Sequence, residues 1–194
     1  MILNKVRTEE SMSEFASRLR EHSPLLRGND FRLLGCIPYQ PELNAPRTRD
    51  VADLLGAQVV NAGDYEQRRM NTIIICARTV ANTVPLLKPG TLVVTPGDRD
   101  DIILAVSLAA INGVPLAGLL LTSDSKPDPR ILELCQGALL AGLPVLSVST
   151  GSYDTANQLN QLNKEIPVDD RERAEIITDY VASHLDADWL NQRC

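Results

Sequence analysis

Hydroxyl-bearing residues recur where three apolar runs of strand length end. Val93-Val94-Thr95, Leu120-Leu121-Thr122 and Val148-Ser149-Thr150 follow one another at intervals of 27 and 28 residues. This spacing is typical of successive β-α units of similar size, because the side chains between the three runs are dissimilar. If the strands are parallel, their ends meet at one carboxyl edge of the sheet, where open α/β sheets bind ligands. Small hydroxyls, glycines and helix N-termini at such an edge can hold an anion.

The candidate ligand-binding residues at this edge are Thr95, Asp98, Arg99, Thr122 and Thr150. The same residue types also cap helices and fill strand-to-helix turns, so the residues by themselves favour capping over a ligand site. Arg99 stands apart, because a cation in the first turn of a helix opposes the helix dipole. If Asp98 and Arg99 are structural, Asp98 caps the following helix and Arg99 bonds a neighbouring carbonyl or carboxylate. If they form a ligand site, Arg99 holds an anion.

Signatures of catalysis are missing from the sequence. There is no G-x-x-x-x-G-K-[ST] phosphate loop and no G-x-G-x-x-G turn. His22 and His184 lie on expected helices at opposite ends of the chain, outside any recognisable nucleophile elbow. Acidic clusters at residues 98–101 and 169–170 could bind a hard cation, but such clusters are more often helix caps. A hydrolase that uses Asp98 lacks a partner base, and we predict no catalytic residue, no metal site and no cofactor.

Charge and composition exclude two classes of partner. The 194 residues carry 19 Lys and Arg against 25 Asp and Glu, a formal charge of −6, and only seven residues are aromatic. A nucleic-acid surface needs positive charge and stacking rings, so no nucleic-acid partner is expected. The apolar runs fall short of the ~20 residues of a membrane span, so no membrane partner is expected. Four cysteines without C-x-x-C spacing, and the lack of a signal peptide, indicate the cytoplasm.

Apolar runs of strand length alternate with helical patterns along the chain. Strands are expected at Ile2–Asn4, Arg32–Ile37, Gln58–Asn61, Thr72–Cys76, Thr91–Thr95, Leu116–Leu121 and Val145–Val148. Helices are expected at Thr8–Glu21, at Asp98–Asn112, from an N-cap at Asp128 with Pro129 in first position to near Gly142, and at Asp170–His184. The alternation predicts an α/β fold in which helices cover both faces of a largely parallel sheet. The helix over 100–111 is apolar nearly all round and is expected to be buried.

Ten short motifs follow one order over roughly residues 30 to 190. They are Asn61–Asp64, Arg68–Arg69, Cys76–Arg78, Gly90–Thr95, Asp98–Arg99, Ala109–Gly113, Leu119–Thr122, Gly142–Val145, Ile166–Arg173 and Asp186–Trp189. In this order and spacing they resemble the DRTGG domain found in the middle of long phosphate acetyltransferases. The resemblance implies an α/β fold, a three-layer α/β/α sandwich with a mostly parallel or mixed sheet, similar to the N-terminal domain of HPr kinase.

The front of the chain is similar to a different domain of the same family. Ile2–Val6 and Leu33–Tyr39 resemble the last strands of the P-loop-type, dethiobiotin-synthetase-like domain that precedes the DRTGG domain. We therefore expect residues 1–45 to be the C-terminal remnant of that domain and residues 46–194 to be the DRTGG domain, which ends in an acidic helix. The chain then looks like a piece of a longer protein, with the family's phosphate loop upstream of Met1 and its acetyl-transfer site downstream of Cys194.

One departure from the family pattern concerns the residues that name the domain. The T-G-G of DRTGG falls on Thr122-Ser123-Asp124, so two side chains, one of them negative, replace the glycines. A turn with positive φ becomes costlier there, and close approach of an anion becomes less favourable. The Asp98-Arg99 half of the motif is present.

The resemblance implies two functions of different kinds. The first is the regulatory and assembly portion of a phosphate acetyltransferase, whose parent reaction converts acetyl-CoA and phosphate to acetyl phosphate and CoA, with this chain inactive by itself. The alternative is a stand-alone sensor of a nucleotide or organic-acid metabolite. The partners expected are a catalytic acetyltransferase domain in cis or in trans, a metabolite as a possible effector, and other copies of the chain. Self-association is expected because a fragment exposes apolar surface, such as the strand Ile2–Asn4.

Overall fold

The computed structural model describes residues 1–7, 10–27, 32–162 and 165–186. The chain divides into two units, one formed by Met1–Asn44 with Ile166–Cys194 and the other by Ala45–Glu165. The terminal helix thus groups with the first 44 residues. The assignment of residues 1–45 to a remnant of one domain and of 46–194 to another stays a prediction.

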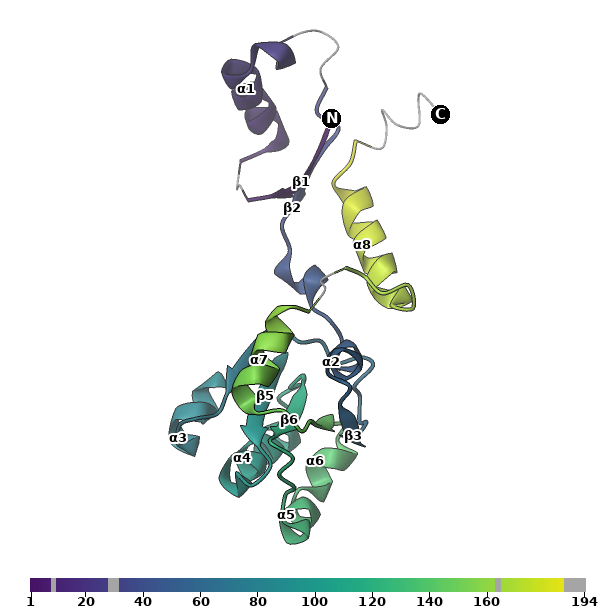
Figure 1. Ribbon diagram of the computed structural model, residues 1–194. Coiled ribbons are helices and arrows are strands. Elements are labelled where there is room, and N and C mark those ends of the chain that lie inside the picture. Colours follow the sequence, from purple (N-terminus) through teal and green to yellow (C-terminus); the bar gives the residue numbers. More distant parts are fainter. Residues whose placement is uncertain (8–9, 28–31, 163–164, 187–194) are drawn as a thin grey trace. The chain divides into compact units, whose positions relative to one another are not determined.

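A five-stranded sheet forms the centre of the second unit (Figure 1). Its strands are β3 (Gln58–Asn61), β4 (Thr72–Ile75), β5 (Thr91–Pro96), β6 (Gly118–Thr122) and β7 (Val145–Ser147). They lie in the order β3-β7-β6-β5-β4; β4 to β7 run parallel, and β3 pairs antiparallel with β7 at one edge. The expectation of a mostly parallel or mixed sheet is confirmed.

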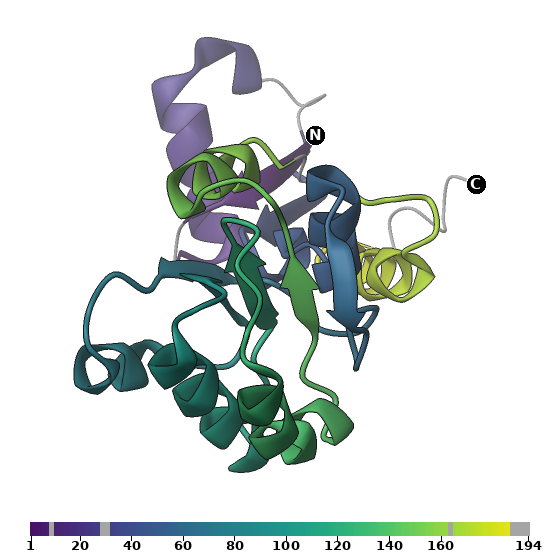
Figure 2. The ribbon, with the colours of Figure 1, turned by 60° about the horizontal axis from the view of Figure 1, so that its bottom comes forward.

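Helices cover both faces of this sheet (Figure 2). One face carries α4 (Asp100–Ile111), α5 (Pro129–Leu134) and α6 (Gln136–Leu140), with α3 (Val80–Thr83) and the 3-10 turn η3 (Val84–Leu86) beside α4. The other face carries α2 (Thr48–Leu55) and α7 (Ser152–Asn160). The predicted three-layer α/β/α sandwich is therefore present in this unit.

Two apolar cores result from the alternation of side chains along the strands. Val93 and Leu121 point to the face of α4, where they pack with Ile102, Ile103 and Val106 of that helix. The residues that alternate with these along each strand, such as Val94 in β5 and Leu120 in β6, pack on the other face against α2 and α7. The central strands are therefore buried on both faces, which is why they appear in the sequence as unbroken apolar runs.

The first unit is built on a pair of parallel strands, β1 (Ile2–Val6) and β2 (Gly35–Pro38). It also contains α1 (Met12–His22), the 3-10 turns η1 (Pro24–Leu26) and η2 (Pro41–Asn44), and α8 (Arg171–Ser183). Ser11 and Glu14 form a capping box that starts α1, and Thr8, where this helix was expected to begin, lies outside the described residues. Leu185, after α8, forms an isolated antiparallel β-bridge with Gly35 of β2. Residues 187–189 of the last family motif, and Cys194, also lie outside the described residues.

The single helix predicted from Asp128 to near Gly142 is wrong in one respect. Asp128 does cap α5, accepting a hydrogen bond from the Arg130 N–H, and Pro129 is its first residue. The helix then breaks at Cys135, whose N–H hydrogen-bonds to the carbonyls of both Ile131 and Leu132 before α6 begins. Cys135 is buried in the core.

The expected burial of α4 is also wrong. Only one of its faces, which includes Ile102, Ile103 and Val106, is buried, while Leu108 and Ile111 on the outer side are 59% and 50% exposed. The reason is the layer order, since a single layer of helices on a sheet gives each helix only one apolar face to pack against. Of the helices within the described residues, none combines the length and apolar character needed to cross a bilayer.

Candidate functional site

The five predicted residues lie at the carboxyl ends of β5, β6 and β7, where the parallel pairing brings them to one edge. We call this edge the strand-end rim and define it as residues 95–99, 122–124 and 150–152. Thr95 is opposite Leu121 in the register, and Thr122 is opposite Pro96. The rim predicted from the spacing of the three strand ends therefore exists.

The hydroxyls of Thr122 and Thr150 are bonded within the chain. Oγ1 of Thr122 lies 2.7 Å from Oγ of Ser152 in the first turn of α7. Oγ1 of Thr150 lies 2.8 Å from Oγ1 of Thr155, which is itself hydrogen-bonded to the Gly151 carbonyl in this arrangement. These contacts hold α7 to the ends of β6 and β7, so the two threonines have a structural role here.

The turn at Ser123 and Asp124, where the family resemblance leads us to expect two glycines, has the backbone conformation that glycine favours. Ser123 and Asp124 have φ values of 68° and 52°, a left-handed conformation that costs a residue with a Cβ about 1–2 kcal/mol. Their N–H groups donate to the carbonyls of Thr150 (2.8 Å) and Val148 (3.3 Å). The two amides therefore join the ends of β6 and β7 and are not free to bind an anion.

Thr95 is fully buried, and the alternation of side chains along β5 places it on the same face as Val93, the face of α4. Among the buried side-chain polar atoms of the described residues, its Oγ1 is left without a hydrogen-bond partner. A ligand reaches this hydroxyl only if the rim opens. The loop that follows Thr95 is closely packed as well, because a Cβ built on Gly97 would lie 1.8 Å from the Ser125 carbonyl oxygen.

Asp98 does not cap α4, contrary to the structural alternative stated above. The helix begins at Asp100, Arg99 occupies the N-cap position, and no side chain bonds the first turn from there. Asp98 is exposed, and within the described part of the chain its carboxylate makes no hydrogen bond. The acidic start of α4, with Asp100 and Asp101, complements the helix dipole.

Arg99 connects the start of α4 to the loop after β4. Its guanidinium donates to the carbonyls of Cys76 (3.2 Å) and Arg78 (3.1 Å), and it forms a two-point ion pair with Asp101 at 2.8 and 2.9 Å. The hydrogen bond with Asp101 raises the pKa of Arg99, and the same bond lowers the pKa of Asp101. The guanidinium N–H groups of Arg99, which would hold the anion in a ligand site, are thus hydrogen-bonded to acceptors within this chain.

Replacing Arg99 with alanine is expected to lower the free energy of unfolding by about 1–2 kcal/mol, because two backbone carbonyls lose a charged donor. Replacing the neighbouring, unbonded Asp98 with alanine is expected to change it by less than ~0.5 kcal/mol. Urea unfolding followed by circular dichroism measures both. Equal stability of the Arg99→Ala variant and the unsubstituted chain would contradict the structural role and favour a ligand site.

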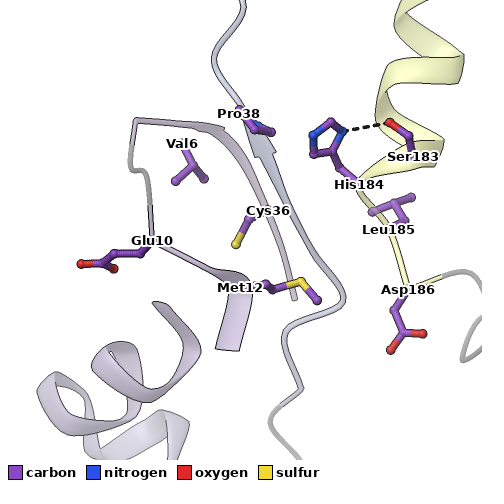
Figure 3. Close-up of a pocket in the computed structure, with 9 residues that line it drawn as sticks. All are labelled: Val6, Glu10, Met12, Cys36, Pro38, Ser183, His184, Leu185 and Asp186. Atoms are coloured by element: carbon purple, nitrogen blue, oxygen red, sulfur yellow. Dashed lines mark hydrogen bonds between the residues drawn. The ribbon is translucent and has the colours of Figure 1, made fainter. Parts of the chain in front are cut away.

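The remaining nucleophiles and histidines do not form a catalytic arrangement in the described residues. Burial raises the pKa of the Cys36 and Cys76 thiols, which disfavours the reactive thiolate. Ser183 lies 3.1 Å from Nδ1 of His184 (Figure 3), but its Oγ donates to the Tyr180 carbonyl and is not activated. The described residues also contain no group of three His, Cys, Asp or Glu side chains placed to hold a metal.

A cavity in the first unit has no counterpart in the sequence analysis. It has a volume of about 420 Å³ and lies among β1, β2, the start of α1 and the end of α8 (Figure 3). The side chains of Cys36, Met12 and Val6 contribute to its mainly apolar wall. No motif pointed to it, because its walls come from segments about 150 residues apart in the sequence.

The motif Asn61–Asp64 has a structural role. Nδ2 of Asn61 donates to the carbonyls of Leu139 (3.2 Å) and Leu143 (2.7 Å), and the Asp64 N–H donates to the Gly142 carbonyl. A Cβ on Gly63 would lie 2.5 Å from that carbonyl oxygen, so glycine is required there. These residues join the end of β3 to the connection between α6 and β7.

Comparison with known proteins assigns the chain to a family. The sequence profile described as "DRTGG domain" matches residues 50–162, more than half of the chain. This chain belongs to the DRTGG domain family. The matched segment begins in α2, ends after α7 and includes the whole strand-end rim.

Three curated relatives contain a segment similar to this chain. A phosphate acetyltransferase of Pseudomonas putida is 89% identical over 194 residues, which are all of this chain and 28% of that protein. One of Pseudomonas aeruginosa is 71% identical over 201 residues, again 28% of that protein. One of Escherichia coli is 40% identical over 174 residues, 90% of this chain and 24% of that protein. The chain thus spans only about 28% of the length of the first two relatives.

A solved structure also shows the fold of the DRTGG domain. The CBS and DRTGG domains of the regulatory region of Clostridium perfringens pyrophosphatase, complexed with the activator diadenosine tetraphosphate, align with a TM-score of 0.51 and 15% sequence identity. The alignment covers 87% of this chain and 74% of that one.

Proposed function

We propose that this chain is the regulatory and assembly portion of a phosphate acetyltransferase, with acetyl transfer carried out by a catalytic domain outside the 194 residues. The parent reaction is the conversion of acetyl-CoA and phosphate to acetyl phosphate and CoA, and the cytoplasm is its compartment. The observation that carries the proposal is the 89% identity with one continuous segment of the P. putida enzyme. The chain by itself is proposed to be inactive.

The geometry of the DRTGG domain supports a structural role. The hydroxyls, amides and guanidinium of the strand-end rim bond to one another, to backbone carbonyls and to Asp101. Such a network fixes the ends of three strands relative to α4 and α7. It thereby gives neighbouring domains or copies a rigid body to bind.

The alternative function is that of a sensor for a nucleotide or organic-acid metabolite. It is favoured by one observation, that the C. perfringens regulatory region was solved in complex with a nucleotide activator. The strand-end rim gives no further support to a sensor function, because Thr95 is buried and the hydroxyls of Thr122 and Thr150 are hydrogen-bonded within the chain. A metabolite effector is therefore proposed only as a regulator of the parent enzyme.

Exchange of segments tests the proposal. We expect a chimera in which this chain replaces the matching 194 residues of the P. putida phosphate acetyltransferase to form acetyl phosphate at the rate of that enzyme. The purified chain alone is expected to form none above a protein-free background. The P. putida enzyme without the segment is expected to lose native mass and its response to effectors, as measured by light scattering and by assays with adenine nucleotides, nicotinamide dinucleotides, pyruvate and phosphoenolpyruvate.

Two results would overturn the proposal. One is acetyl phosphate formation by the isolated chain that co-purifies with it and disappears in a variant such as Asp98→Ala. The other is an enzyme without the segment that keeps both its native mass and its effector response. An active chimera whose rate is unaffected by every compound of the panel would leave assembly as the role of the segment and exclude the tested effectors.

A further inference from the structure

The outer face of α4 is apolar and exposed, whereas the face that carries Ile102, Ile103 and Val106 belongs to the core. Leu108 is 59% exposed, and the face continues into a groove of about 490 Å³ between α4 and the α3–η3 segment. Val80 and Val84 form the opposite wall of this groove. A helix that is apolar nearly all round is normally covered on all sides, so this face is expected to meet a partner.

The α4 side of the groove has a regular pattern. It consists of Asp101, Leu104, Ala105, Leu108, Ala109 and Asn112. These positions are three, four, seven, eight and eleven residues from the first one, which places them on one side of an α-helix and is the spacing of a helix-pairing seam. The seam has polar residues at its two ends and leucine and alanine between them.

We propose that a second copy of this chain covers this face, with the two α4 helices antiparallel about a two-fold axis that passes between Ala105 and Leu108. The inference rests on the proposed assembly function and names the surface that serves it. In this register Leu108 of each copy lies against Ala105 of the other, and Leu104 lies against Ala109. Every large side chain thus meets a small one, as close packing of two helices requires.

The ends of the seam fit the same register. Asp101 of one copy lies opposite Asn112 of the other, so an amide donor meets a carboxylate acceptor. The helix dipoles are antiparallel, which is favourable. A parallel pairing would instead place Asp101 against Asp101 and Leu108 against Leu108, which brings like charges together and leaves the alanines unfilled.

The chemistry of the groove favours another copy over a charged partner. The charged residue among those that line the groove is Asp101, and its carboxylate is already paired with Arg99. A strongly basic or acidic segment would gain no ion pair from such a surface. A second copy offers the same apolar seam, and a surface that complements itself is what a two-fold dimer needs.

The test is the mass of the chain in solution. In sedimentation equilibrium we expect the unsubstituted chain to form a dimer and Leu108→Glu to raise the dissociation constant by at least about 100-fold, because two carboxylates enter an apolar seam. Leu140→Glu is the matched control, since Leu140 is 83% exposed on α6 and does not line the groove; it should leave the constant unchanged. Adding Ala105→Lys to Leu108→Glu should restore the dimer, because position 105 faces position 108 of the partner.

Each other outcome counts against the proposal. A chain that stays monomeric at all concentrations, or a Leu108→Glu variant that still dimerises, would show that α4 does not pair with itself. A Leu140→Glu variant that dissociates as strongly would place the interface elsewhere. Failure of the Ala105→Lys rescue in a variant with an unchanged melting temperature would overturn the antiparallel register. The isolated chain is measured without acetyl transfer, so failure here is distinct from failure of the chimera.

Discussion

Replacing Gly97 with serine is expected to lower the free energy of unfolding by about 3 kcal/mol or more, which is at the upper end of the cost of overpacking. A Cβ on Gly97 would lie 1.8 Å from the Ser125 carbonyl oxygen and 2.6 Å from its carbon. Both atoms belong to the backbone, so no side-chain rotation relieves the overlap. The loops after β5 and β6 would have to separate, and the strand-end rim would open with them.

The same substitution at Gly151 is the control. Gly151 also lies at the rim, in the N-cap position of α7, but a Cβ there has no atom within 4 Å and its φ is −67°. Serine is a good N-cap residue, so Gly151→Ser is expected to stay within ~0.5 kcal/mol of the unsubstituted chain. Urea unfolding of both variants gives the comparison. A Gly97→Ser variant as stable as Gly151→Ser would mean that the two loops are not in contact.

The position of the sheet could be predicted from the sequence because its central strands are buried on both faces. Such strands appear as short apolar runs between turn residues, as Thr91–Pro96 and Gly118–Thr122 do. The direction of the edge strand β3 could not be predicted, since its three exposed residues follow no pattern that distinguishes parallel from antiparallel pairing. The break at Cys135 was missed because no proline marks it and the nearby glycine, Gly137, lies inside α6 and not at the break.

The residues of the rim could be predicted, whereas their bonding could not. In parallel β-α units, the residues at the ends of the strands lie at one edge of the sheet. The spacing of the three strand ends in the sequence therefore predicts which residues these are. The acceptors of Ser123 and Arg99 are backbone carbonyls at Thr150 and Cys76, more than 20 residues away in either direction. Such pairings depend on how the loops cross in space. The exposed face of α4 was missed for a related reason, because an apolar pattern does not say which side of a helix the sheet will cover.

Replacing Asp50 with alanine is expected to lower the free energy of unfolding by about 3 kcal/mol, the cost of removing one partner of a buried ion pair. Oδ1 of Asp50 lies 2.8 Å from Nη2 of Arg47, and the two side chains are only 14% and 8% exposed. Oδ2 also accepts the Arg47 N–H at the start of α2. The alanine variant therefore leaves both a buried guanidinium and a helix amide without this carboxylate.

Two further variants separate these contributions. Asp50→Asn keeps an oxygen for the Arg47 N–H and removes the charge, so a loss of about 1–2 kcal/mol is expected from the weaker hydrogen bonds alone. Asp53→Ala, on the same helix, removes a carboxylate that is 72% exposed and 3.8 Å from Arg49, and is expected to cost less than ~0.5 kcal/mol. If Asp50→Ala and Asp53→Ala unfold at the same urea concentration, the Arg47–Asp50 pair is solvated in solution and α2 is held to the sheet by its apolar face alone. If only Asp50→Ala is destabilised, the pair fixes the first turn of α2, from which Thr48 donates 2.6 Å to the Ala117 carbonyl just before β6.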